Sequence, residues 1–227
     1  MKFPREVPVM TLPDATLFPR ALLHLHIFEP RFRRMLHDVL HSHRMFAVAM
    51  LKPGSTREAP SPVAGLGLIR AAVRHSDGTA HLFLQGLIRV GLEQTVRYRP
   101  YRLQRIRLLP TPPCDSVAAD ALLAKVRELV VERVSQGPPF AGGLEPPEIT
   151  TQLLPQPLAA KPKEILHYLD SIEDPERAAD LVGREMLHVP VERQAILETV
   201  DIEARLRRLI QFLLADIRKR RKENTYE

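Results

Sequence analysis

The hydrophobic pattern of this chain changes period once, near Pro110, and this change constrains the fold more than any other feature of the sequence. Up to Leu109, apolar residues mostly alternate with other residues, as they do on strands with one buried face. From Ser116 onward they recur every three or four residues, as on amphipathic helices. This order favours an α+β fold over repeated strand–helix–strand units around a parallel sheet. We expect a first part over residues 1–110 and a second part over residues 111–227.

The first part contains six or seven short predicted strands and one inserted helix. Asp77-Gly78 separates two alternating runs, which is a strong hairpin signal because both residues tolerate a positive φ. Gly86 and Gly91 interrupt the run that follows and indicate a bulge or a tight bend. The helix is predicted to begin at Pro30, where the missing N–H costs nothing. Other strands are expected near residues 22–27, 46–51, 66–73, 80–84 and 101–109.

The second part is predicted to be helical. Helices are expected at residues 116–134, 163–172, 175–187 and 190–199, and a longer one begins after Asp201. In that last helix the apolar residues from Ile202 to Ile217 follow a 3.6-residue period. The segment Gly137–Pro162 holds seven prolines and three glycines, so it is predicted to be a long connection with at most a short helical turn near Glu145–Leu154.

Composition excludes several classes of protein. The chain has 227 residues and one cysteine, which excludes an internal disulfide framework and an all-cysteine metal cage. No window reaches the roughly 18 uninterrupted apolar residues of a membrane span, and no apolar region follows the N-terminus, so we expect a cytoplasmic protein without a membrane partner. The net charge of +6 permits binding to nucleic acid or to an acidic partner without requiring it.

Four histidines leave two interpretations open. His24 and His26 share one face of a predicted strand, and His37 and His41 share one turn of the predicted helix, so together they could bind a transition metal. The alternative is an ordinary polar surface, and it is favoured because His37 and His41 lie off the apolar stripe of the helix. We therefore predict no metal site.

No motif indicates catalysis. Cys114 lies in a proline-rich linker beside an acid, without a neighbouring cation that would activate it as a nucleophile. No serine lies in a G-x-S-x-G or S-x-x-K motif. The acid of Glu29-Pro30-Arg31 is explained best by a favourable position at a helix N-terminus. The basic run Arg218–Lys222 fits a solvated helix end, with nucleic acid or an acidic protein as alternative partners.

Several segments, taken in order, resemble the N-terminal substrate-binding domain of the Lon protease family over about Val7 to Arg218. They are Pro8–Pro13, Leu17–Pro19 and Leu23–Met35 at the start, Gly67–Ile69, Asp77–Thr79 and Leu84–Val90 in the middle, and Asp174–Leu181 and Gln194–Asp201 in the helical part. The resemblance implies a PUA-like small β-barrel followed by a helical bundle that ends in a long helix. Lon itself continues into an ATPase and a Ser/Lys protease. This sequence has no G-x-x-x-x-G-K-[ST] loop and stops at Glu227, so we expect a stand-alone member that is not an enzyme and needs no cofactor.

The resemblance implies a non-catalytic module that binds exposed apolar segments of unfolded or partly unfolded polypeptides, or that acts as an adaptor for a partner protein. The alternative is an RNA-binding module, because PUA-like barrels elsewhere often bind RNA and this chain is basic; the absence of tryptophan argues against it. A third class, an enzyme acting on a small ligand, has no residue pattern that names its chemistry. The oligomeric state is left open.

The predicted binding patch consists of Phe28, Phe140 and Leu144. Phe28 follows an alternating run whose other apolar members point to the opposite face. Phe140 and Leu144 lie in the Gly137–Pro162 connection, which is longer than a compact domain normally has without a function. The alternative is that Phe28 seals one end of the barrel and that the connection contributes nothing to binding.

Overall fold

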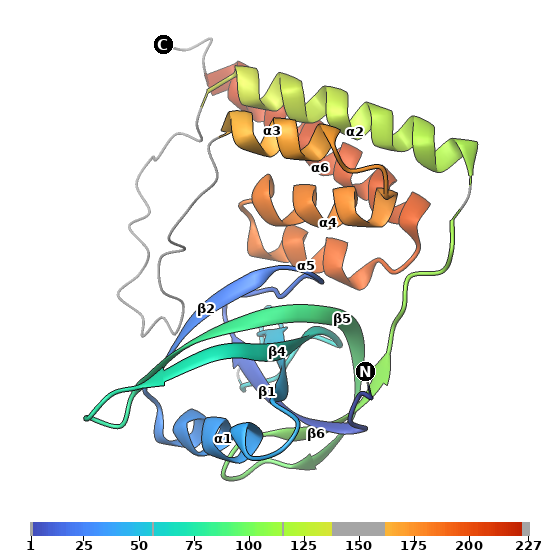
Figure 1. Ribbon diagram of the computed structural model, residues 1–227. Helices are drawn as coiled ribbons and strands as arrows, with labels where there is room; N and C mark the ends of the chain where they lie inside the picture. Colours follow the sequence, from blue (N-terminus) through green and yellow to red (C-terminus); the bar gives the residue numbers. More distant parts are fainter. Residues whose placement is uncertain (1, 56, 115, 138–161, 224–227) are drawn as a thin grey trace. The chain divides into compact units, whose positions relative to one another are not determined.

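The computed structural model describes residues 2–55, 57–114, 116–137 and 162–223. These residues divide into a unit of strands that ends at Pro110 and a unit of helices that begins at Thr111 (Figure 1). The strand-rich unit contains one helix, α1 (Pro30–Leu40). Its strands are β1 (Glu6–Leu12), β2 (Leu22–Ile27), β3 (Met45–Met50), β4 (Val63–Arg74), β5 (Ala80–Arg97) and β6 (Leu103–Leu108).

The six strands in the described part of this unit form one sheet in the order β2-β5-β4-β3-β1-β6. β5 pairs with β6 as well as with β2 and β4, so the order β5-β4-β3-β1-β6 returns to β5. Most neighbours are antiparallel, as the hairpin signals predict. β1 and β3 are parallel, with Val9 opposite Ala47, because the chain passes through β2 and α1 between them.

The structure has one long strand, β5, where Gly86 and Gly91 indicated a bulge or a bend, and the register shifts beside Gly86, since Leu66 lies opposite Ile88 and Gly67 lies opposite Gly86. Gly86 does not end this strand. A Cβ atom at Gly86 would lie 2.0 Å from the backbone oxygen of Phe18, so the glycine permits the loop before β2 to approach the sheet. Gly65 on β4 has the same role, since a Cβ atom there would lie 1.9 Å from the backbone oxygen of Leu17. The glycines therefore mark a close backbone approach, one of the two usual reasons for a glycine inside a strand.

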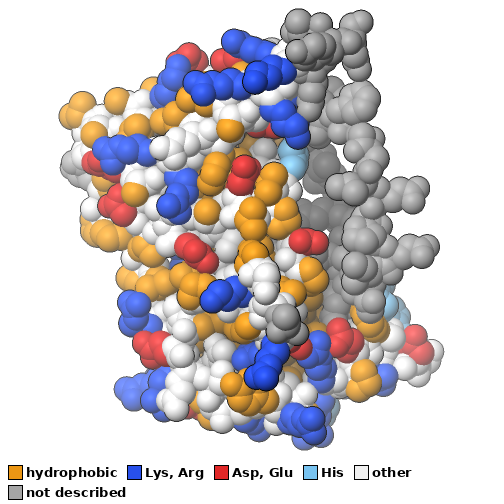
Figure 2. Space-filling view, turned by 180° about the vertical axis from the view of Figure 1, so that it is seen from behind, with side chains coloured by type: hydrophobic (Ala, Val, Ile, Leu, Met, Phe, Trp, Pro, Cys, Tyr) orange, Lys and Arg blue, Asp and Glu red, His pale blue; other side chains and the backbone are white. Residues whose placement is uncertain are grey.

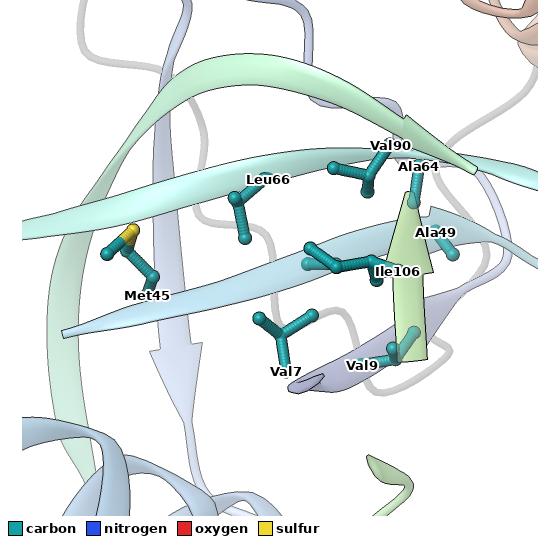
Figure 3. Close-up of a cluster of buried hydrophobic side chains, with 9 residues drawn as sticks. Val7, Val9, Met45, Ala49, Ala64, Leu66, Val90 and Ile106 are labelled. Atoms are coloured by element: carbon teal, nitrogen blue, oxygen red, sulfur yellow. The ribbon is translucent and has the colours of Figure 1, made fainter. Parts of the chain in front are cut away.

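The core of this unit lies between the strands. Its buried members come from β1, β3, β4, β5 and β6 and include Val7, Val9, Met45, Leu66, Val90 and Ile106 (Figure 3). α1 buries the predicted stripe of Phe32, Met35, Leu36 and Val39. At its start, Arg31 donates a hydrogen bond of 2.8 Å to Glu29, as expected for a structural role of that acid.

The helical unit consists, in its described part, of α2 (Val117–Ser135), α3 (Pro162–Asp170), α4 (Pro175–Glu185), α5 (Pro190–Glu198) and α6 (Ile202–Glu223). The side chain of Ser116 accepts a hydrogen bond from the backbone N–H of Ala119, and Asp174 accepts one from Glu176, so both predicted starts carry an N-cap. α2 packs along α6. The predicted helical turn near Glu145–Leu154 lies outside the described residues.

A buried arginine joins several segments of this unit. Arg205 of α6 is fully buried, and its guanidinium donates to the Asp180 carboxylate at 3.1 Å and to the Thr111 hydroxyl at 3.1 Å. It also donates to the backbone oxygens of Thr199 at 2.7 Å and Val200 at 2.8 Å. A buried charge must be paired and hydrogen-bonded, and this geometry satisfies both needs.

A second ion cluster fixes the end of α6 to α2. Arg133 of α2 is buried and forms an ion pair with Asp216, which also lies 3.0 Å from Arg220. Burial alone would raise the pKa of Asp216, but the hydrogen bond and charge of Arg133 hold it below its ordinary value. Arg221 forms an ion pair of 2.6 Å with Glu132. Part of the basic run at Arg218–Lys222 therefore pairs with acids.

Candidate functional site: a histidine face on the sheet

The strand register brings several rings to one face of β2, β5 and β4. His24 lies opposite Phe83 and His26 lies opposite His81 across the β2–β5 pair. In the β4–β5 pair, His81 lies opposite Val73. The alternate residues of β2, Leu23, Leu25 and Ile27, are buried on the other face. We call the set of His24, His26, Val73, His75, His81 and Phe83 the histidine face.

The rings of the histidine face contact one another. His24 stacks on Phe83 with ring centroids 4.5 Å apart. His81 lies edge-on to His26 and to His75, each at 4.8 Å, and to His24 at 5.7 Å. The four imidazoles and one phenyl ring therefore form a single cluster rather than separate surface side chains.

The surroundings of the cluster are apolar and accessible. Val73 is 61% exposed, and Leu22, one residue before the buried part of β2, is 48% exposed. The rings of His24, His26, His81 and Phe83 are partly buried, and His75 is exposed. Exposed apolar side chains grouped with aromatic rings are typical of surfaces that bind a partner.

The pKa of His81 in this cluster lies below its ordinary value. Burial lowers the pKa of His81, and the charges that His26, His75 and His24 would carry lower it further. The carboxylate of Asp77, in the turn beside His75, accepts hydrogen bonds from the Thr79 backbone and hydroxyl at 2.9 and 2.8 Å. At neutral pH His81 is therefore a neutral, aromatic member of the histidine face.

β2 also offers a strand edge. Among the described strands it pairs with β5 alone, so its other edge has no strand partner there. The Nδ1 atom of His24 is buried and has no hydrogen-bond partner among the described residues. An edge with unpaired backbone groups can accept a further extended segment.

The structure places one of the three predicted site residues. Phe28 directly follows β2, is half-buried, and its ring lies 5.5 Å from His26, at the end of the histidine face. Phe140 and Leu144 lie outside the described residues. The sequence indicated Phe28 and the shared face of His24 and His26. It missed Phe83, His81 and Val73, because only the register brings them to β2.

The histidines do not group as a metal site would require. His37 and His41 are exposed on α1 and stack with each other at 4.5 Å, separately from the histidine face. Across the described ranges, no group of three or more histidine, cysteine, aspartate or glutamate side chains could hold a metal ion. In the same ranges no helix has the length and apolar character needed to cross a membrane.

The architecture defines the class of domain to which this chain is similar. It matches the N-terminal domain of the Mycobacterium avium complex Lon protease with a TM-score of 0.68 and 17% identity, covering 92% of this chain and 97% of that one. It also matches the Lon N-terminal domain protein from Xanthomonas campestris with a TM-score of 0.61 and 16% identity, covering 91% and 98%. At these identities the likeness shows the fold alone.

Comparison of the sequence with known families shows to which family the chain belongs. The model of the ATP-dependent protease La (LON) substrate-binding domain matches residues 6–215, and the chain belongs to this family. Lon protease of Dictyoglomus thermophilum is 23% identical over 219 residues, which cover 94% of this chain and 25% of that protein. Lon protease of Phenylobacterium zucineum is 29% identical over 157 residues, covering 68% and 17%. The chain spans about a quarter or less of the length of these relatives.

Proposed function

We propose that this protein is a non-catalytic module that binds exposed apolar segments of other polypeptides on the histidine face. The family is that of a substrate-binding domain, which supports a recognition role. The observation that carries the proposal is the continuous ring cluster beside the edge of β2 that has no strand partner among the described residues. The ring cluster offers apolar contact area, and the strand edge offers backbone hydrogen bonds that do not depend on the sequence of the bound polypeptide.

The proposed binding mode is addition of an extended segment along β2. Main-chain hydrogen bonds to the edge of β2 would supply affinity for any unfolded chain. Apolar side chains of the segment would lie on Phe28, His26 and the exposed Leu22. Folded proteins have few extended segments with free backbone groups, so this mode selects unfolded or partly unfolded polypeptides.

The proposal includes two finer features of the fold and setting. The return of the strand order to β5 supports a small barrel of the PUA-like type. We propose that this non-catalytic binding module acts as an adaptor or as a recognition domain, and that it does so in the cytoplasm. A nucleic-acid role, the alternative from the sequence, needs a basic surface rather than this apolar one.

The experiment compares two pairs of exposed apolar residues. Leu22→Ser with Val73→Ser changes the histidine face, and Val117→Ser with Val191→Ser changes exposed positions on the helical unit. Binding of a reduced and alkylated, permanently unfolded polypeptide is measured by fluorescence anisotropy. The first pair is expected to weaken binding about thirtyfold, since each of the two apolar side chains loses roughly 1 kcal/mol of contact. The second pair is expected to bind like the parent.

Equal affinity of the two double variants, with unchanged thermal stability, would refute the histidine face as the binding surface. Phe28→Ser tests the predicted patch in the same assay, because Phe28 lies beside His26. Phe140→Ser with Leu144→Ser tests the other two predicted residues. Loss of binding only in this last variant would assign the site to the connection instead.

A further inference from the structure

The end of β5 and the connection to β6 carry a dense group of arginines and tyrosines that the proposed polypeptide site does not use. Its sequence from residue 97 to 102 is Arg-Tyr-Arg-Pro-Tyr-Arg. We call the set of Arg97, Tyr98, Arg99 and Arg102 the Arg/Tyr tip. In Figure 2, Lys and Arg side chains lie among apolar ones on the surface of the strand-rich unit.

Tyr101 anchors the Arg/Tyr tip to the unit. It is buried, and its hydroxyl donates a hydrogen bond of 3.0 Å to Asp38 of α1. Burial and the hydrogen bond to Asp38 raise the pKa of Tyr101, so its hydroxyl keeps the donated proton at neutral pH. The guanidinium of Arg97 lies over the Tyr101 ring at 4.9 Å. Tyr101 therefore holds the Arg/Tyr tip to α1.

Tyr98 is the exposed ring of the tip. It is 67% exposed, and the guanidinium of Arg102 lies 5.0 Å from its centroid. Arg102 also donates to the hydroxyl of Thr95 at 3.4 Å and to the backbone oxygen of Glu58, and these bonds hold its planar group in place. An accessible tyrosine ring beside an ordered guanidinium is a flat platform of the kind on which bases stack.

The arginines of the tip keep their charge available. Within the described ranges, no carboxylate lies within ion-pairing distance of Arg97, Arg99 or Arg102. The next arginines along β6 differ, since Arg105 lies 3.6 Å from Glu6 and Arg107 lies 3.6 Å from Glu93. Among the described residues, the charges of these three arginines are therefore not offset by a paired carboxylate, unlike those of Arg105 and Arg107.

We propose that the Arg/Tyr tip binds single-stranded nucleic acid. Its three arginines would contact phosphates, and the exposed face of Tyr98 would stack on an unpaired base. An acidic polypeptide would use the charge but would have no need for the ring. Duplex bases are already stacked on each other, so a platform of this kind selects single strands. The inference is independent of polypeptide binding, because it concerns a different surface.

The test uses labelled oligo-uridine and oligo-thymidine of about 12 nucleotides, within the range of common site sizes. Arg97→Gln with Arg99→Gln removes two charges from the tip, and Arg70→Gln with Arg74→Gln removes two exposed charges from β4. The first pair is expected to lower affinity about tenfold or more, and to reduce the slope of log affinity against log salt by about 1.4. The control pair is expected to change affinity less than threefold.

Tyr98 distinguishes nucleic acid from a general anion. Tyr98→Leu is expected to weaken binding about fivefold or more, as for the loss of one stacked base, while Tyr98→Phe binds like the parent. A poly-glutamate peptide should bind weakly and be indifferent to both changes. The comparison of oligo-uridine with oligo-thymidine shows whether the tip prefers RNA or DNA, and either preference supports the proposal.

Three outcomes would overturn the proposal: equal loss in the Arg70/Arg74 control, preference for duplex over single strands, or no effect of Tyr98→Leu. Thermal melts confirm that each variant is folded. Arg97 covers Tyr101, so its change could disturb the fold. If it does, the Arg99→Gln and Tyr98→Leu variants provide the same test. Binding of the unfolded polypeptide is expected to be unchanged in all of them.

Discussion

Replacement of Arg205 by methionine should destabilise the helical unit strongly. The change keeps most of the side-chain volume and removes the guanidinium that contacts Asp180, Thr111 and two backbone oxygens. Removing one partner of a buried ion pair typically costs about 3–5 kcal/mol, because the remaining charge stays buried. Carbonyl groups left without a donor cost about 1–3 kcal/mol each, and these costs overlap rather than add. We therefore expect a loss of about 3–5 kcal/mol in the free energy of unfolding.

Urea unfolding followed by far-ultraviolet circular dichroism measures this loss, since most of the helical signal comes from this unit. Arg208→Met is the matched control: its side chain donates to the Ala195 carbonyl and the Thr199 hydroxyl from an exposed position, and we expect a change below about 1 kcal/mol. Arg205→Met combined with Asp180→Leu should recover about 2 kcal/mol, because the buried carboxylate is then gone as well. A loss below about 1 kcal/mol for Arg205→Met alone would refute this account of the network.

Three further predictions concern the sheet, the histidine face and the end of α6. Gly65→Ala should lower the free energy of unfolding by more than about 2 kcal/mol, because its Cβ would meet a backbone oxygen. Gly91→Ala, whose Cβ would have its nearest atom 3.7 Å away, should change the free energy of unfolding by less than about 1 kcal/mol. Similar urea midpoints for both variants would contradict the close approach at Gly65. The pKa of His81 in the folded protein is below its ordinary value of 6.5, so the unfolded chain binds more protons than the folded one as the pH falls through about 6.5, and stability should fall with it. Urea titrations at several pH values should show a weaker pH dependence for His81→Asn than for the parent. Identical profiles of the two proteins would count against the ring cluster. Deletion of residues 218–227 should leave the fold intact and cost about 1–2 kcal/mol, since it removes the exposed Arg221–Glu132 pair and the largely buried Arg220 beside Asp216. A larger loss of stability would show that the segment contributes to packing beyond these ion pairs.

The helices were the most predictable part of the fold. Their starts carry local signals, such as Ser116 and Asp174 as N-caps, and their apolar residues lie within a few turns of each other. The strand boundaries were harder, since β5 is one strand of 18 residues where a strand was predicted near residues 80–84, although the irregularity predicted at Gly86 is present as a register shift. A glycine that permits a close backbone approach and a glycine that ends a strand have the same sequence signal.

The candidate sites depended on pairings that the sequence does not contain. His24 and Phe83 are far apart in the chain and meet only through the register of β2 with β5. The shared face of His24 and His26 was predictable from alternation within one strand. The Arg/Tyr tip is visible in the sequence as a run of residues, but the exposure of Tyr98 and the absence of nearby carboxylates depend on the folded surroundings. The predicted division into residues 1–110 and 111–227 as folding domains stays a prediction.

The pairing of β1 with both β3 and β6 affects the order in which this chain can fold as it leaves the ribosome. Glu6 lies opposite Arg105, so the first strand to be synthesised must wait for the last one. Until β6 has emerged, one edge of β1 and one edge of β5 remain open in the nascent chain, and open edges are where strands of other molecules pair. The edge of β1 that pairs with β6 therefore stays open until nearly the whole strand-rich unit has been synthesised, whereas the edge of β5 is open only for the few residues that separate β5 from β6.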